Sequence, residues 1–302
     1  MAAAEAPSNA LAGEEGARRA ARLRRRALAE RRWSLVTIVL GLAIVVGVPV
    51  ASYVVPLLRD VQPNAQDLTA TLQHPSVAHP FGTDNVGRDV LARVFAATPL
   101  DYQVGFATTL ASLMIGVVLG AVAGYFGGAL DTIIMRLVDV MIAFPFLVFV
   151  LAFIAVFGAG LTGIYVGLTV FGWAVFARVT RAEMLGVRER QYIAAARTLG
   201  LSTRRILVVH ALPNVLRPNL VIAMATLVWN ILTLATLSFL GVGVQPPQAE
   251  WGSIVADGQT YLLSDWWLPT LPGLVIVLVG VGFSLIGDGI ADRFGYDFRL
   301  TV

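Results

Sequence analysis

The chain contains no cysteine and no lysine among its 302 residues. The absence of cysteine excludes disulfide bonds, thiol catalysis and metal sites with cysteine ligands. The absence of lysine excludes a Walker A phosphate-binding loop, because that motif uses a lysine to contact the nucleotide phosphates. The chain therefore cannot be a P-loop ATPase, and we expect it to have no catalytic site of its own.

Charge and histidine are also scarce. Charged residues make up 14% of the chain and hydrophobic residues 57%, and the mean hydropathy is +0.76. This composition is typical of a polytopic membrane protein. Of the three histidines, His74 and His79 lie in one loop that is predicted to be external, His210 lies far from both, and no HExxH motif occurs. We therefore predict no metal site.

Long charge-free runs predict the membrane spans. A helix needs about 20 residues to cross the hydrocarbon core of a bilayer. The run from Val140 to Ala177 is too long for one span and contains Gly158-Ala159-Gly160, a turn signal. Pro145 should kink the helix before this turn after Phe144. We predict an all-α polytopic fold with six transmembrane helices, over residues 34–57, 102–126, 133–157, 163–184, 216–243 and 268–290.

The arginines predict the orientation of these spans. All 22 basic residues are arginines; eight lie in the tail 1–32 and eight between Arg178 and Arg217. The positive-inside rule places both clusters in the cytoplasm, and six spans then put both termini there. The predicted organisation is a cytoplasmic tail over 1–32, the first helix and an external loop over 33–100, a core over 101–291, and a cytoplasmic tail over 292–302.

Small and polar residues within the spans predict how the helices pack. Gly116, Gly120, Gly124 and Gly128 recur every four residues, which predicts a flat ridge for a neighbouring helix. Arg136 and Asp139 are spaced to form an ion pair along the third span. Trp229 and Asn230 are candidates to line a pathway, but Asn230 could equally make a hydrogen bond between helices.

The Arg-rich segment 188–213 lies between the fourth and fifth predicted spans. The spacing of Tyr192, Ile193, Ala196 and Leu199 predicts a short amphipathic helix with one apolar face. Gly200 would end this helix, and Pro213 would end a second short helix before the fifth span. Such a helix can be gripped by another protein or can lie on anionic lipid, and the pattern alone leaves both open.

Four motifs resemble one family of membrane transporters. Ala195, Ala196, Gly200 and Leu212-Pro213 resemble the E-A-A…G…I-x-L-P coupling loop of ABC-importer permeases, although Ala194 replaces the usual Glu and His210 the usual Ile. Three further stretches resemble, in order, the C-type permease subunit of the dipeptide/oligopeptide/nickel class. They are HPFGTDNVGRD (79–89), SFLGVGVQPP with the following EWG (238–252), and GDGIAD (287–292). The resemblance runs from about residue 33 to 299.

This resemblance implies a type I ABC importer permease in a bacterial inner membrane, with a cytoplasmic coupling-helix loop between the fourth and fifth helices. The implied partners are a paralogous B-type permease, two ABC ATPase subunits, an extracytoplasmic solute-binding protein and the lipid membrane, with no nucleic acid. This chain would bind no cofactor, because ATP and Mg²⁺ would be used by the ATPases. Peptides are the expected cargo, with nickel or another small solute as alternatives. A secondary transporter is the alternative of another class, although mid-membrane ionisable groups are not evident.

The resemblance also implies two sets of site residues. The set implied to couple transport to the ATPases is Tyr192, Ile193, Ala194, Ala195, Ala196, Leu199, Gly200, Leu212 and Pro213. The set implied to form the signature of the external loop, near the solute-binding protein, is Gly82, Thr83, Asp84, Gly87, Arg88 and Asp89.

Overall fold

The computed structural model describes residues 6–59 and 61–294, with side chains described from Trp33 onward. In this part of the chain the regular elements are helices. The loop 61–89, which we call the external loop after its predicted location, adds one isolated β-bridge between Thr83 and Asp89. The elements in chain order are α1 (Ala6–Arg59), α2 (Val90–Phe126), α3 (Gly128–Ala143), α4 (Phe146–Phe157), α5 (Leu161–Arg188), α6 (Gln191–Thr198), α7 (Thr203–Arg205), a π-helical segment (Ile206–Ala211), α8 (Leu212–Phe239), α9 (Trp251–Gln259) and α10 (Trp267–Phe294).

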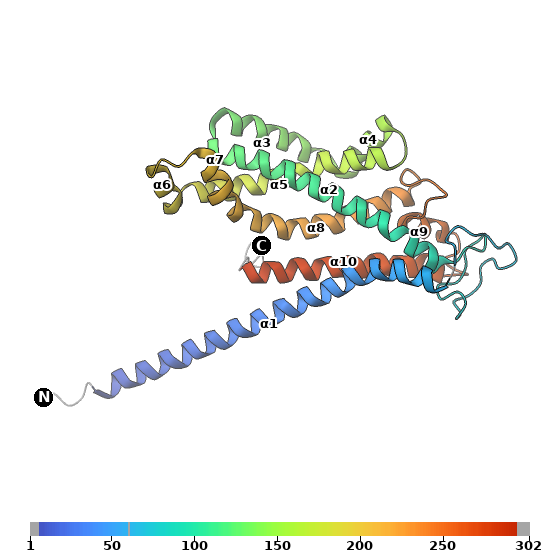
Figure 1. Ribbon diagram of the computed structural model, residues 1–302, viewed down its shortest axis with the longest axis horizontal. Coiled ribbons are helices and arrows are strands. Elements are labelled where there is room, and N and C mark those ends of the chain that lie inside the picture. The colour runs from blue at the N-terminus through green and yellow to red at the C-terminus, as the bar shows by residue number, and fades with distance from the viewer. Residues whose placement is uncertain (1–5, 60, 295–302) are drawn as a thin grey trace.

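The described helices include five that are long and apolar enough to cross a membrane, namely Trp33–Arg59 of α1, α2, α5, the stretch Thr203–Phe239 and α10. The pair α3 and α4 passes the same test but is bent by 93°. With this pair counted as one span, the chain has the six spans that the sequence predicts. In Figure 1 the long helices form an elongated bundle, and α1 extends beyond it toward the N-terminus.

The bend between α3 and α4 lies where Pro145 predicts a kink. Phe144 has an extended backbone, with φ −79° and ψ 141°, because the proline ring disfavours a helical conformation for the residue before it. The break is wider than a simple kink and leaves helix-end backbone groups without partners inside the helix. Irregular backbone at membrane depth is tolerated only where protein or water covers it.

The second helix begins earlier than predicted, at Val90 instead of residue 102. The Asp89 carboxylate accepts a hydrogen bond from the Ala92 N–H at 2.8 Å and caps α2, and the helix then passes through Pro99. A helix of 37 residues is about 55 Å long, so α2 is longer than the hydrocarbon core. The predicted boundary between 33–100 and 101–291 therefore falls inside α2.

The glycine ridge on α2 packs against α5. A Cβ atom on Gly116, Gly120 or Gly124 would lie 2.5, 2.4 or 2.7 Å from the nearest atom of α5, so the two helices are in close contact. The prediction is wrong for Gly128. The chain turns at Gly127 and Gly128, both with positive φ, and a Cβ on Gly128 would meet no atom within 4 Å.

Ion pairs join α3 to α5. The Asp139 carboxylate accepts a hydrogen bond from Arg178 at 2.7 Å, and Asp131 accepts two from Arg181 at 2.7 and 2.6 Å. The predicted pair of Arg136 with Asp139 is therefore wrong. The sequence shows spacing along one helix, whereas the carboxylate is oriented by the arginine of the helix packed beside it.

Candidate functional site

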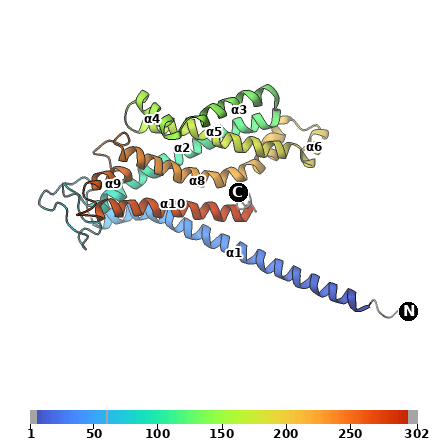
Figure 2. The same cartoon turned by 180° about the vertical axis from the view of Figure 1, so that it is seen from behind.

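The short helix α6 lies at the end of the bundle opposite the external loop (Figures 1 and 2). Its Ile193 and Ala196 side chains are buried in an apolar cluster built by α5 and the chain that follows α7. Tyr192 and Leu199, which the sequence places on the same face, are exposed, and Leu199 is 78% exposed. The buried face is therefore narrower than predicted, and it is covered by the protein itself.

Gly200 ends α6 as the sequence predicts. Its φ is +74°, a left-handed conformation that favours glycine. The Gly200 N–H donates to the Arg197 carbonyl at 3.0 Å and the Leu201 N–H to the Ala196 carbonyl at 3.1 Å, which is the Schellman pattern. A Cβ on Gly200 would meet no atom within 4 Å, so the requirement for glycine comes from the backbone alone.

Pro213 does not end a helix, and this prediction is wrong. The chain from Thr203 to Phe239 forms one continuous helical span, in which Pro213 lies in the first turn of α8. The π-helical segment Ile206–Ala211 directly precedes it, and the Leu212 N–H bonds to the Leu207 carbonyl five residues back. The wider π turn makes room for the proline ring.

A hydrogen bond ties α6 to α8. The Asn214 side-chain amide donates to the Tyr192 hydroxyl at 3.2 Å and to the His210 carbonyl at 2.8 Å. Leu212 is half-buried and Pro213 exposed, while Ala194 and Ala195 lie exposed on α6. The predicted coupling residues therefore gather at one end of the molecule, where this hydrogen bond joins α6 to α8.

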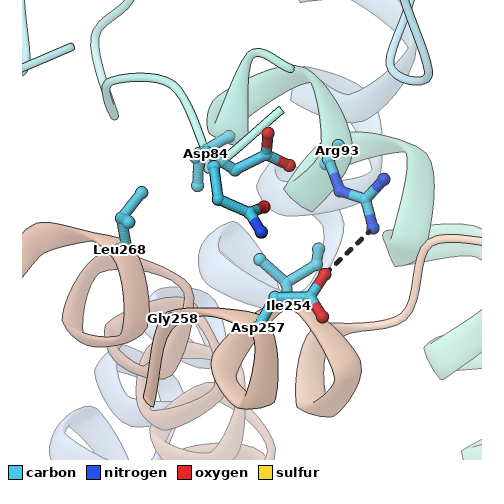
Figure 3. Close-up of a pocket in the computed structure, with 8 residues that line it drawn as sticks. Asp84, Arg93, Ile254, Asp257, Gly258 and Leu268 are labelled. Carbon is cyan, nitrogen blue, oxygen red and sulfur yellow. Dashed lines mark ion pairs between the residues drawn. The ribbon is translucent and has the colours of Figure 1, made fainter. Parts of the chain in front are cut away.

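In the external loop, Asp84 and Arg88 join the loop to α9. The Asp84 carboxylate accepts bonds from the Val86 and Arg88 N–H groups at 3.0 and 2.9 Å, and from the Arg88 guanidinium at 2.6 Å. The Arg88 guanidinium lies 3.4 Å from the Asp257 carboxylate. The Arg93 guanidinium lies 3.8 Å from the same carboxylate, as the dashed line in Figure 3 shows. Burial raises the pKa of Asp257, and the two arginines oppose that rise.

Asp89 joins the same loop to two helices. Besides capping α2, its carboxylate lies 2.9 Å from His79 Nδ1 and 3.3 Å from the guanidinium of Arg59, the last residue of α1. His79 is thus a hydrogen-bonding residue of the loop.

The remaining signature residues shape the loop backbone. Gly82 and Gly87 have positive φ, and a Cβ on either would collide with the backbone of Gln73 or Asp67. The Thr83 hydroxyl donates to the Ala70 carbonyl at 2.5 Å and accepts from the Gln73 N–H at 2.8 Å. The predicted signature therefore holds the external loop in one shape.

Trp229 and Asn230 have different surroundings. The Asn230 amide donates to the Thr108 and Thr109 hydroxyls of α2 at 2.9 and 3.0 Å, which is a hydrogen bond between helices. Trp229 is 57% exposed. Its ring lies 5.8 Å from that of Phe146, and with Phe171 these rings line an open recess of about 290 Å³ between α4, α5 and α8.

Sequence reasoning missed the buried carboxyl pair Asp101 and Glu250. Neither has exposed surface. Glu250 accepts bonds from the Gly252 and Ser253 N–H groups at 2.8 Å each and caps α9, and Asp101 accepts one from the Trp251 N–H at 3.4 Å. Asp101 directly precedes a charge-free run, so its position in the sequence indicates the edge of a membrane span. A helix traced from a cap at Asp89 would have placed it inside α2.

Comparisons with known proteins point to one family. A family model described as "Binding-protein-dependent transport system inner membrane component" matches residues 116–299. The chain is 42% identical over 237 residues to the probable D,D-dipeptide transport system permease protein DdpC of Escherichia coli (strain K12), covering 78% of this chain and 80% of that protein. It is 35% identical over 260 residues to the dipeptide transport system permease protein DppC of Haemophilus influenzae, covering 84% and 88%.

A solved structure has a similar fold. A chain of the MetNI methionine ABC transporter in an inward-facing conformation aligns with a TM-score of 0.53 at 20% identity, over 69% of this chain and 96% of that chain. The family match covers more than half of the sequence, and the curated relatives match most of it. The chain therefore belongs to the family of binding-protein-dependent transport system inner membrane components, whose members are multi-pass permease subunits of ABC importers.

Proposed function

We propose that this permease imports di- or oligopeptides and that it forms the translocation pathway together with a paralogous B-type permease. The curated relatives carry names of peptide and dipeptide permeases, which supports this cargo. The observation that carries the proposal is α6, which is held by its buried residues and the Gly200 turn while its other face stays exposed. That face is free to contact a partner that delivers the energy for transport.

Two separate ATPase subunits bind ATP and Mg²⁺ in this proposal, and the chain itself binds no cofactor and catalyses no reaction. Closure of the ATPases on ATP displaces α6, and the displacement reaches α8 through the Tyr192–Asn214 hydrogen bond. Because α8 carries Trp229, the movement changes the face that borders the pathway. The permease thus has two conformations whose balance the nucleotide sets.

The recess beside Trp229 supports a pathway on this face. It opens outward from the chain and begins at Phe146, directly after the bend at Pro145. A broken helix at membrane depth needs protein or water beside it, which a partner permease and a pathway would supply. The lining is mostly apolar, with Asn230 and Thr226 as its polar side chains. It suits peptide side chains better than nickel, which needs imidazole or carboxylate ligands.

The outer end of the chain faces a solute-binding protein in this proposal, and both termini lie in the cytoplasm. The arginines at the α6 end support this orientation through the positive-inside rule. On the outside, the network around Arg88 and Asp89 keeps the loop rigid, so that a docked binding protein meets a fixed surface. Asp101 and Glu250 do not favour a proton-coupled carrier, because Glu250 caps α9, which is not one of the candidate spans.

A valine at position 200 tests this function. The left-handed conformation of Gly200 costs a residue with a Cβ about 1–2 kcal/mol, so Gly200→Val should distort the tip of α6 without a steric clash. We expect the variant to insert and to co-purify with its partners, but ATP-driven peptide uptake by the reconstituted complex should be abolished.

The matched control is Gly186→Val, in a helix of the same region, where a Cβ also meets no atom within 4 Å. It should transport normally. Transport by Gly200→Val at the wild-type rate would show that α6 does not couple the ATPases to the pathway.

A further inference from the structure

A second recess, which we call the polar recess, lies at the end of the bundle that carries α6 (Figure 2). It has a volume of about 300 Å³ and is lined by Glu183, Val187, Arg190, Tyr192, Asn214 and Arg217. These residues come from the end of α5, from α6 and the residue before it, and from the start of α8. None of them lines the apolar recess beside Trp229. The volume is at the lower end for ligand pockets and fits a small solute.

Two arginines of the polar recess are available to a ligand. Arg190 and Arg217 are exposed, and neither has an ion pair within residues 33–59 and 61–294. The Arg217 guanidinium lies over the Phe294 ring at 5.6 Å, a contact that leaves the N–H groups in the guanidinium plane free. Such groups donate paired hydrogen bonds to a carboxylate or a phosphate. The two arginines therefore favour a ligand with an anionic group.

The same recess also contains a carboxylate. Glu183 is half-buried and has neither an ion pair nor a side-chain hydrogen bond to any described residue. A negative charge at this place repels a ligand that is wholly anionic, such as phosphate, and attracts an ammonium group. The lining thus suits a ligand that carries one charge of each sign.

Tyr192 and Asn214 add neutral hydrogen-bonding groups between these charges. The Asn214 amide donates to the Tyr192 hydroxyl at 3.2 Å and to the His210 carbonyl at 2.8 Å, which uses both of its N–H groups. The Tyr192 hydroxyl accepts one of these bonds, so its own proton can be donated to a ligand. The Asn214 side-chain oxygen accepts no hydrogen bond from the described residues and can accept one from a ligand.

The lining is poorly suited to the headgroup of a phospholipid. A lipid bound at its headgroup also needs apolar surface for its acyl chains. Val187 is the one apolar residue that lines the polar recess, and its side chain is nearly buried in the protein. The recess therefore suits a solute that is polar at both ends.

We propose that the polar recess binds a small zwitterion, namely an amino acid or a dipeptide. Its carboxylate pairs with Arg190 and Arg217, and its ammonium group pairs with Glu183. The bound zwitterion contacts α5, the residue before α6 and α8 at once, so it joins these three elements. This site is separate from the proposed pathway, and it does not depend on the partner that α6 contacts.

Calorimetric titration of the purified full-length chain with dialanine tests the chemistry of the ligand. Dialanine should bind at a saturable site. N-acetyl-dialanine lacks the ammonium group and dialanine amide lacks the carboxylate, so each should bind about tenfold more weakly or worse, because one charged pair is lost.

Three variants test the location of the site. Arg217→Gln and Glu183→Gln should each raise the Kd for dialanine about tenfold or more. Arg204→Gln is the matched control, because it removes the same charge from an exposed residue outside the recess. It should bind dialanine as the wild type does. Binding that survives both Arg217→Gln and Glu183→Gln lies elsewhere on the chain and overturns the proposal.

Three further outcomes would overturn the proposal. The first is the absence of saturable dialanine binding up to about 10 mM. The second is binding of inorganic phosphate that Glu183→Gln strengthens, which would identify a site for anions. The third is a loss of co-purifying phosphatidylethanolamine in Arg217→Gln while dialanine does not bind, which would identify a lipid site. None of these results bears on the proposed function, because no step of the test measures transport.

Discussion

Single buried carboxyl groups help to assemble the end of the molecule that carries α9. Glu250 has no exposed surface, and two backbone N–H groups of α9 donate to it. Burial raises the pKa of Glu250, because the charged form loses its hydration, and the hydrogen bonds offset only part of that rise. Trp251 next to it donates its indole N–H to the Val94 carbonyl at 3.0 Å. Glu250 thus caps α9, and Trp251 beside it joins α9 to α2.

The raised pKa of Glu250 predicts how stability depends on pH. The folded protein holds this proton more tightly than the unfolded chain does. Its contribution is fully present below the ordinary glutamate pKa of about 4.3 and is lost as pH rises through the raised value. Between the ordinary pKa of glutamate and the raised pKa of Glu250, the free energy of unfolding should fall by up to about 1.4 kcal/mol for each pH unit.

Thermal unfolding of the purified protein across this range measures the effect. Glu250→Gln should flatten the fall of Tm, since the amide cannot titrate. Glu189→Gln is the control, because the Glu189 side chain is 75% exposed, and it should leave the slope unchanged. Equal slopes for wild type and Glu250→Gln would contradict the account.

Individual elements show what sequence patterns can and cannot predict. The end of α6 at Gly200 and the bend at Pro145 could be predicted, because each depends on the backbone of one residue. The start of α2 could not, since Pro99 and Asp101 interrupt the apolar run although the helix continues through both. The pairing of Asp139 with Arg178 could not be predicted either, because Arg178 lies on α5, a helix that packs beside α3 but is distant in the sequence.

The close contact of α2 with α5 predicts a clear difference between two glycines. In Gly120→Ala the new Cβ would lie 2.4 Å from the Ala177 carbonyl oxygen, so the helices must separate. We expect a loss of about 1–3 kcal/mol in the free energy of unfolding. Gly186→Ala meets no atom within 4 Å and should be neutral or stabilising by up to about 1 kcal/mol. Denaturant unfolding in detergent compares them, and equal effects would argue against a packed ridge.

The whole molecule has two ends with different chemistry. At one end the external loop and α9 form a fixed structure around Asp84, Asp89 and Asp257. At the other end α6 and its neighbours present exposed arginines. Apolar runs were enough to predict six spans, because charge is costly to place in a membrane. The arginine distribution predicts which of the two ends faces the cytoplasm. The recess beside Trp229 needed the structure, because residues from three helices line it.

The most direct measurement of the central claim is the side of the membrane on which α6 lies. The natural chain has no cysteine, so single cysteines can be labelled without background. Ser202 and Gln248 are both exposed, one beside α6 and the other before α9. With a thiol reagent that cannot cross the membrane, Gln248→Cys should be labelled in intact cells and Ser202→Cys only after lysis. Labelling of Ser202→Cys in intact cells would place α6 outside, where no ATPase can reach it, and would contradict the account.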